Sequence, residues 1–245
     1  MKSVFLNIPI DVLSMDETLQ HINNCIAYQK FTQHVVVNAA KIVDMQHDQL
    51  LRQSVLESDI INADGMAVVW ASRFLGKPLP ERVAGIDLMM NLVEMAHEKG
   101  YKCFFLGAKE EVVTKVVEIF KEKYSESIIA GYRNGYFDEQ EEESIAKEIA
   151  NSGAHMLFVA ISSPKKEIFV NKYKNIMKVP FVMGVGGSFD VVAGKTKRAP
   201  LWMQKMGMEW FYRFIQEPRR MWKRYLIGNS KFIWLVLKEK FKSEK

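Results

Sequence analysis

The strongest constraint on the fold is an alternation of short apolar segments with longer segments of helical periodicity. Several apolar segments are rich in β-branched residues, as buried strands commonly are. The predicted strands are His34–Val37, Asp59–Ala63, Cys103–Leu106, Ile128–Ala130, Met156–Ile161 and Phe181–Met183. The predicted helices between them include Ile86–Lys99, Glu111–Tyr124 and Glu141–Ser152. This alternation predicts an α/β fold, with a Rossmann-like, mainly parallel sheet flanked by helices.

The last part of the chain has a different chemistry. Residues 195–245 hold 14 Lys and Arg against 4 Asp and Glu, whereas residues 1–194 hold 20 against 25. Four of the five tryptophans also lie in residues 195–245. The helices expected there are Trp202–Gln216 and Pro218–Lys240, with breaks at Gly207 and Gly228. We therefore predict an α/β catalytic domain over residues 1–194 and a helical, basic and aromatic C-terminal appendage over residues 195–245.

The start of the second appendage helix is amphipathic on a helical wheel. Basic residues occupy one arc of about 140°, and apolar and aromatic residues occupy the opposite arc. The basic residues are Arg219, Arg220, Lys223 and Arg224, and the others are Met221, Trp222, Tyr225 and Leu226. This pattern is typical of helices that lie on anionic membranes. The same pattern would also arise if the aromatic residues pack onto the catalytic domain while the charged residues are solvated.

Three further features bear on the compartment. No segment approaches the ~20 apolar residues that a membrane-spanning helix needs. The N-terminal apolar stretch is interrupted by Asn7, Pro9 and Asp11, unlike an export signal. The two cysteines, Cys25 and Cys103, do not suggest a disulfide framework. We expect a cytoplasmic protein, peripheral on the inner face of the cell membrane.

Open parallel sheets bind ligands beyond the carboxyl ends of their strands. Four features follow predicted strands at such ends: Asn38, Asp64-Gly65, Gly107 and Gly184–Gly187. Asp64 is suited to act as a general base, although it could equally cap the next helix. The Gly184–Gly187 turn could admit a phosphate close to the backbone or be a plain tight turn.

Two more charged residues are candidates for the same site. Asp190 could accept hydrogen bonds from sugar hydroxyls or cap a turn. Arg82, in a proline-rich connection, suits recognition of a diphosphate but could also be a solvated surface residue. No Asp-x-Asp sequence occurs that could hold a divalent ion on a diphosphate, so we expect no metal and no cofactor.

Two other function classes fit parts of the pattern. A nicotinamide- or flavin-dependent oxidoreductase would use the α/β fold and the glycine cluster, but Phe189 stands where the third glycine of the dinucleotide fingerprint belongs. A nucleic-acid-binding or basic lipid-binding module would use the appendage. We expect no nucleic-acid partner.

Taken in order along the chain, these motifs resemble those of the WecG/TagA/CpsF family of bacterial glycosyltransferases. The resemblance covers nearly the whole chain. It is carried by Asn38, Asp64-Gly65, Arg82–Leu88, Phe104–Gly107, Gly131, Gly135–Phe137, Ser163–Glu167, Gly184–Asp190, Arg198–Pro200, Glu209–Arg213, Glu217–Arg220 and Arg224-Tyr225.

The resemblance implies an inverting, metal-independent glycosyltransferase of cell-surface polysaccharide or teichoic-acid synthesis. The donor would be a UDP-sugar, with N-acetylmannosamine as the expected sugar and UDP-glucose as the alternative. The acceptor would be a sugar linked to undecaprenyl diphosphate at an anionic membrane surface, and a homo-oligomer is compatible with the family.

The resemblance also assigns roles to residues. Asp64 matches the proposed general base, and the appendage is expected to complete the active site. The expected donor-site residues are Asn38, Arg82, Gly107, Lys166, Gly184, Gly186, Gly187 and Asp190. The arginines expected to face the acceptor diphosphate and the membrane are Arg213, Arg219, Arg220 and Arg224.

The chain departs from the family pattern at two positions. Val36 replaces a threonine that usually stands two residues before the asparagine, and Lys166 replaces the glutamine of Pro-Lys-Gln-Glu. A neutral amide thereby becomes a cation near the expected donor. These two changes bear on which sugar the donor carries.

Overall fold

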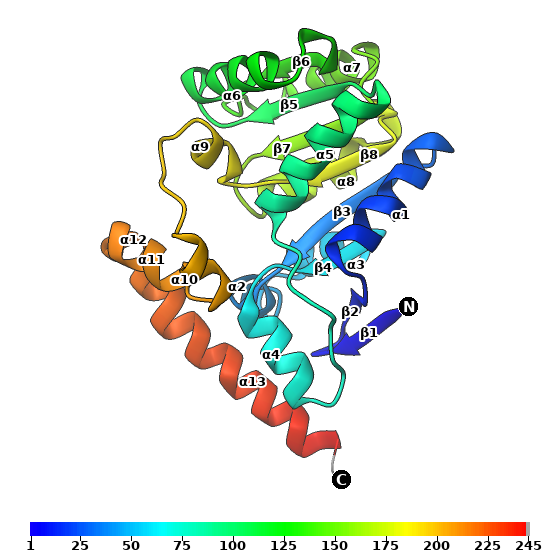
Figure 1. The fold of residues 1–245 in the computed structure, drawn as a ribbon. Helices are drawn as coiled ribbons and strands as arrows, with labels where there is room; N and C mark the ends of the chain where they lie inside the picture. The colour runs from blue at the N-terminus through cyan, green and yellow to red at the C-terminus, as the bar shows by residue number, and fades with distance from the viewer. Residues whose placement is uncertain (244–245) are drawn as a thin grey trace.

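The core of the protein is a six-stranded, all-parallel sheet with strand order β4-β3-β8-β7-β5-β6 (Figure 1). The computed structural model describes residues 1–243, without the side chains of Phe5, Arg220, Lys223, Arg224 and Ser243. The strands are β3 (Thr32–Val37), β4 (Ile60–Ala63), β5 (Cys103–Gly107), β6 (Ile129–Arg133), β7 (Met156–Ala160) and β8 (Phe181–Gly184). All six predicted strands are present, and the predicted α/β fold with a parallel sheet is confirmed.

Helices cover both faces of the sheet, because successive strand residues alternate between two apolar cores. Phe105 and Phe158 pack with α1 (Met15–Ala27), α5 (Gly85–Lys99) and α6 (Glu110–Lys123). Phe104 and Leu157 pack on the opposite side with α7 (Glu142–Asn151) and α8 (Lys165–Met177). The remaining elements of this part are α2 (Ala39–Asp44), α3 (Gln49–Leu56), α4 (Met66–Phe74), α9 (Ser188–Val192) and the short 3-10 helix η1 (Glu126–Ile128).

An antiparallel hairpin, which the strand pattern did not predict, opens the chain. It pairs β1 (Lys2–Phe5) with β2 (Ile8–Asp11) through a two-residue turn whose residues, Leu6 and Asn7, both have positive φ. Such turns match the twist of paired strands. The Asp11 carboxylate accepts a hydrogen bond from the Ile61 amide at 2.8 Å, which attaches the hairpin to β4.

The appendage is helical, as predicted, and the expected break at Gly207 is confirmed, whereas the one at Gly228 is not. Gly207, with φ 72°, separates α10 (Leu201–Lys205) from α11 (Glu209–Gln216). Gly228, in contrast, does not end a helix, because α13 (Gly228–Ser243) begins there, directly after the π-helical segment η2 (Lys223–Ile227) and α12 (Pro218–Trp222).

The appendage crosses the carboxyl end of the sheet and then returns along the molecule (Figure 1). Phe232 and Val236 of α13 are buried in the same apolar cluster as Ile42 of α2 and Val68 of α4. Across the part of the chain that the structure describes, no helix combines the length and apolarity needed to cross a bilayer. The division into two domains near residue 195 stays a prediction.

Candidate active site

Asp64 lies at the carboxyl end of β4, directly beside the end of β3. Its amide donates a hydrogen bond to the Val37 carbonyl at 2.8 Å, and Gly65 follows with φ 142°, a conformation that favours glycine. The predicted alternative, in which Asp64 caps α4, is wrong, because Gly65 occupies the cap position without a side-chain hydrogen bond. Among the described residues, the Asp64 carboxylate has no hydrogen-bond partner, so it is available to a substrate.

Asn38 lies beside this turn, at the carboxyl end of β3. Its Oδ1 accepts a hydrogen bond from the Lys41 amide at 3.0 Å, which caps α2. The Asn38 side-chain amide group is not used in that cap, so it remains a donor that can face the site. The structure therefore brings Asn38 and Asp64 together, as the sequence predicted.

The environment of Asp64 favours a carboxylate that can take up a proton. Burial raises its pKa above the ordinary value, and the negative charge of Glu209 adds to that effect. Arg82, Lys41 and Arg213 oppose the rise through their positive charges. A raised pKa brings a carboxylate closer to the range in which a general base works well.

A network of four charged residues joins the appendage to the loop that precedes α5. Arg82 forms an ion pair with Glu209 through Nη1, and its Nη2 lies 4.0 Å from the Asp87 carboxylate. Arg198 binds Asp87 through two hydrogen bonds, one of them 2.7 Å from Nη2 to Oδ2, and binds Glu209 through Nε at 3.2 Å. We call these four residues the outer network. Its loop is held in place by a hydrogen bond of 2.9 Å from the Val83 amide to the Ala63 carbonyl.

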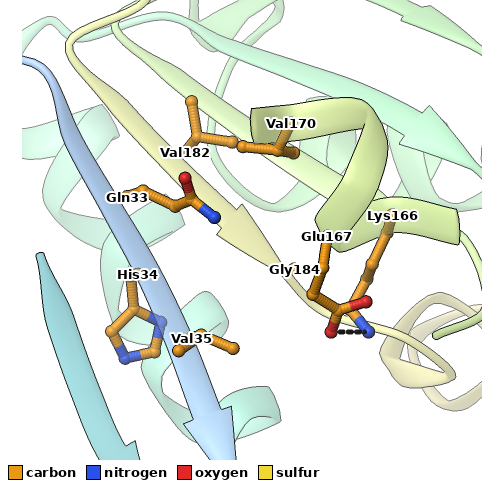
Figure 2. A pocket seen from close by; sticks show the side chains of 8 residues that line it. All are labelled: Gln33, His34, Val35, Lys166, Glu167, Val170, Val182 and Gly184. Carbon is orange, nitrogen blue, oxygen red and sulfur yellow. Dashed lines mark ion pairs between the residues drawn. The ribbon is translucent and has the colours of Figure 1, made fainter. Parts of the chain in front are cut away.

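A second ionic cluster lies at the start of α8. Figure 2 shows its residues Lys166 and Glu167 beside β3 and β8. Lys41 and Lys166 both bind Oε1 of Glu167, at 2.9 and 2.7 Å, and all three side chains are nearly buried. Burial alone would raise the pKa of Glu167, but the two ammonium groups outweigh it and hold the pKa below its ordinary value. We call Lys41, Glu167 and Lys166 the inner network.

Lys166 is thus in the predicted region but is engaged by a protein carboxylate. Its aliphatic part crosses the end of β8, since a Cβ at Gly184 would lie 2.6 Å from Lys166 Cε. The small cavity of Figure 2, lined by Gln33, His34, Lys166, Glu167 and Gly184 among others, has a volume of about 10 Å³ and is too small for a substrate.

The glycine-rich turn faces the appendage. A Cβ at Gly187 would lie 3.8 Å from Nη2 of Arg213, so this arginine of α11 lies over the turn and also within electrostatic range of Asp64. Gly187 caps α9, which contains Asp190 in its first turn. The turn, Asp190 and Arg213 therefore belong to one region of the sheet edge.

The other predicted site residues are more widely spread. Gly107 ends β5, four strands from β4 in the sheet, which corresponds to about 19 Å at the usual strand spacing. Arg219 is exposed on α12. Arg220 and Arg224 were predicted to share its role, but their side chains lie outside the described residues.

Sequence reasoning assigned no site role to several residues that the structure places here. Four of them lie within the motifs that carry the family resemblance, and this position is the sequence signal that could have identified them: Asp87, Glu167, Arg198 and Glu209. Lys41 gave no signal beyond its place three residues after Asn38.

Together, the parallel sheet, the Asp64 carboxylate and the surrounding cations define a Rossmann-like α/β protein with a candidate active site at the carboxyl edge of its sheet. The chain belongs to the WecG/TagA/CpsF family of glycosyl transferases, whose family model matches residues 3–245. This membership confirms the resemblance and favours the glycosyltransferase over the oxidoreductase and the nucleic-acid-binding module.

Two curated relatives carry the same enzyme name. The protein is 39% identical over 194 residues to the N-acetylglucosaminyldiphosphoundecaprenol N-acetyl-β-D-mannosaminyltransferase of Bacillus spizizenii, covering 79% of this chain and 74% of the relative. It is 40% identical over 182 residues to the enzyme of that name from Bacillus subtilis, covering 74% of this chain and 70% of the relative.

Proposed function

We propose that the protein transfers N-acetylmannosamine from a UDP-sugar to N-acetylglucosaminyl-diphosphoundecaprenol, with inversion at the anomeric carbon. The observation that carries the chemistry is the Asp64 carboxylate, which has no hydrogen-bond partner among the described residues. Burial raises its pKa, and it lies at a sheet edge lined with cations. The names of the two relatives support the choice of sugar and acceptor. A UDP-glucose-type donor is the second candidate, because the chain departs from the family pattern at Lys166, which lies beside Gly184.

In this mechanism Asp64 accepts the proton of the attacking acceptor hydroxyl. The hydroxyl oxygen forms a bond to the anomeric carbon of the donor, while the bond from that carbon to the diphosphate oxygen breaks. The bond pair leaves with UDP. Attack from the face opposite the leaving group inverts the configuration, which matches the β linkage in the relatives' names if the donor is α-linked.

The leaving diphosphate gains negative charge, so nearby cations and amides stabilise the transition state. Arg213 and the Gly184–Gly187 turn lie close enough to act together on it. The inner network, with two lysines on one carboxylate, adds a net positive charge at the same edge, where Arg82 offers its guanidinium as a further hydrogen-bond donor. We propose that these groups make a divalent metal unnecessary, with Asn38 and Asp190 positioning the donor sugar and ribose and Gly107 allowing close approach at the distal end.

The appendage supplies a surface for the membrane. Leu201, Trp202, Met206, Ile215 and Leu226 are large apolar side chains, each more than half exposed, on helices rich in lysine and arginine. Such a surface suits the interface of an anionic bilayer. We propose that it binds the inner face of the membrane and that Arg219, which is exposed on α12, contacts the diphosphate of the acceptor there. The same role for Arg220 and Arg224 stays a prediction from the sequence.

A donor screen tests the proposal. The full chain is incubated with a lipid-diphosphate N-acetylglucosamine acceptor and, separately, with UDP-N-acetylmannosamine, UDP-N-acetylglucosamine and UDP-glucose, with and without EDTA. We expect one N-acetylhexosamine added from the first donor, unaffected by EDTA, as read by mass spectrometry. Addition of a hexose from UDP-glucose would support the second candidate, and failure of all donors would overturn both.

A further inference from the structure

Among the described residues Asp64 has no hydrogen-bond or ion-pair partner, although the positive charge of Arg82 acts on it electrostatically. Glu209 of α11 uses both carboxylate oxygens, Oε2 on Arg82 and Oε1 on Arg198. Arg198 is held in turn by the bidentate contact with Asp87 in the first turn of α5. The two cations and two anions balance, so Arg82 is directed toward the appendage rather than toward Asp64.

We propose that Glu209 is a positioning residue of the active site: its carboxylate holds the Arg82 guanidinium away from Asp64 and so keeps Asp64 free to accept the substrate proton. This inference rests on the proposed function, in which Asp64 is the base. Glu209 itself is unsuited to that role, because two guanidiniums already occupy its oxygens.

The physical reason is that the carboxylates of Glu209 and Asp64 compete for the Arg82 guanidinium. Without the Glu209 charge, Arg82 keeps only the 4.0 Å contact with Asp87, whose carboxylate Arg198 already binds through two hydrogen bonds. Asp64, which has no hydrogen-bond partner among the described residues, is then the free carboxylate within electrostatic range of Arg82. A direct ion pair would both lower the pKa of Asp64 and cover the oxygen that must receive the proton. The appendage would thus tune the base as well as cover the site.

The groups that face Asp64 come from three elements. Arg82 lies on the loop before α5, Glu209 and Arg213 lie on α11, and Lys41 lies on α2. Burial and Glu209 raise its pKa, whereas the three cations lower it. Glu209 is the only carboxylate among these charged groups, so its neutralisation has a predictable sign.

The test compares Glu209→Gln with Arg82→Gln and with two controls. Arg198→Gln loosens the same docking contact but changes a residue that does not shift the Asp64 pKa, and Glu239→Gln removes the same charge elsewhere on the appendage. The pKa of Asp64 is measured by ¹³C NMR titration of labelled aspartate, assigned with Asp64→Asn. The pH profile of kcat and the donor KM are measured alongside.

We expect Glu209→Gln to lower the Asp64 pKa, to move the acidic limb of the kcat profile to lower pH, and to reduce kcat by about tenfold to a hundredfold with little change in KM. Arg82→Gln should move the pKa upward. Arg198→Gln should leave the pKa in place, whatever its effect on kcat, and Glu239→Gln should resemble the wild type.

An unchanged or raised Asp64 pKa in Glu209→Gln would overturn the inference, as would an equal fall in Arg198→Gln, which would indicate docking alone. The NMR titration needs no substrate. If the wild type transfers none of the sugars while the pKa shifts as expected, the proposed function fails and the positioning role stands.

Discussion

The inner and outer networks have similar chemistry but different settings. In the inner network, Glu167 is 3% exposed and both of its lysines come from elements of the sheet domain. In the outer network, Glu209 is 27% and Asp87 36% exposed, and the contacts join the appendage to the loop before α5 and to the first turn of α5. Buried ion pairs are costly to break, whereas exposed pairs contribute little to stability. The inner network therefore belongs to the folded framework, and the outer one is suited to functional adjustment.

Charged residues of both networks act on Asp64, namely Lys41 of the inner network and Arg82 and Glu209 of the outer one. Removal of the Asp64 carboxylate should have the largest effect on activity and little effect on stability. We expect Asp64→Asn to reduce transfer by about a hundredfold to ten-thousandfold, the usual contribution of a general base. Donor binding, measured by isothermal titration calorimetry with UDP, should be retained. Turnover close to the wild-type rate would show that another group accepts the proton.

Replacement of the glutamate of each network by glutamine should show which network stabilises the fold. Glu167→Gln leaves two buried ammonium groups without their shared carboxylate, and we expect a loss of about 3 kcal/mol in the free energy of unfolding. Glu209→Gln, in contrast, should cost less than about 1 kcal/mol because the pair is partly solvated. Urea unfolding of the two variants measures the difference, and equal losses would contradict the comparison.

The buried region should also be more sensitive to acid, through His34 on β3. In Figure 2 this residue projects from the opposite side of β3 from Gln33. Burial lowers the pKa of His34 to about 4, with Lys41 adding to the shift and the hydrogen bond to Asn62 opposing it. Asn62 donates to Thr18 through Nδ2, so its Oδ1 accepts the Nε2 proton of a neutral His34.

The sign of the pH dependence follows from the two pKa values. The unfolded chain takes up the His34 proton below about pH 6.5, while the folded protein does not until about pH 4. Stability is therefore lost as the pH falls through this window, by up to about 3 kcal/mol for a shift of this size. Unfolding of the wild type and of His34→Gln at several pH values measures the effect. Parallel curves would show that His34 does not titrate in this way.

Much of the fold could be predicted because burial on both faces of a parallel sheet leaves a local signature. The six strands are short apolar runs, and α5 ends at Gly100, which adopts the left-handed conformation expected of a helix stop. The N-terminal hairpin was missed because Pro9 and Asp11 interrupt its apolar pattern. Its turn residues, Leu6 and Asn7, are not the asparagine-glycine pair that marks such turns most clearly.

In the candidate site, too, some features could be predicted from the sequence and others could not. Asp64, Asn38 and the Gly184–Gly187 turn could be located because each directly follows a strand, and the ends of parallel strands share one edge. The Arg82–Glu209 and Lys41–Glu167 contacts could not, because each joins side chains more than a hundred positions apart in sequence.

The sequence by itself therefore determined the α/β sheet, the position of the Asp64 carboxylate and the basic, aromatic character of the appendage, since these depend on local patterns of burial and charge. Only the tertiary structure decided where the appendage docks, that Glu209 rather than Asp64 binds Arg82, and that Lys166 is engaged by Glu167. The physical reason is that electrostatic interactions depend on distance and burial in three dimensions, which the order of residues along the chain does not contain.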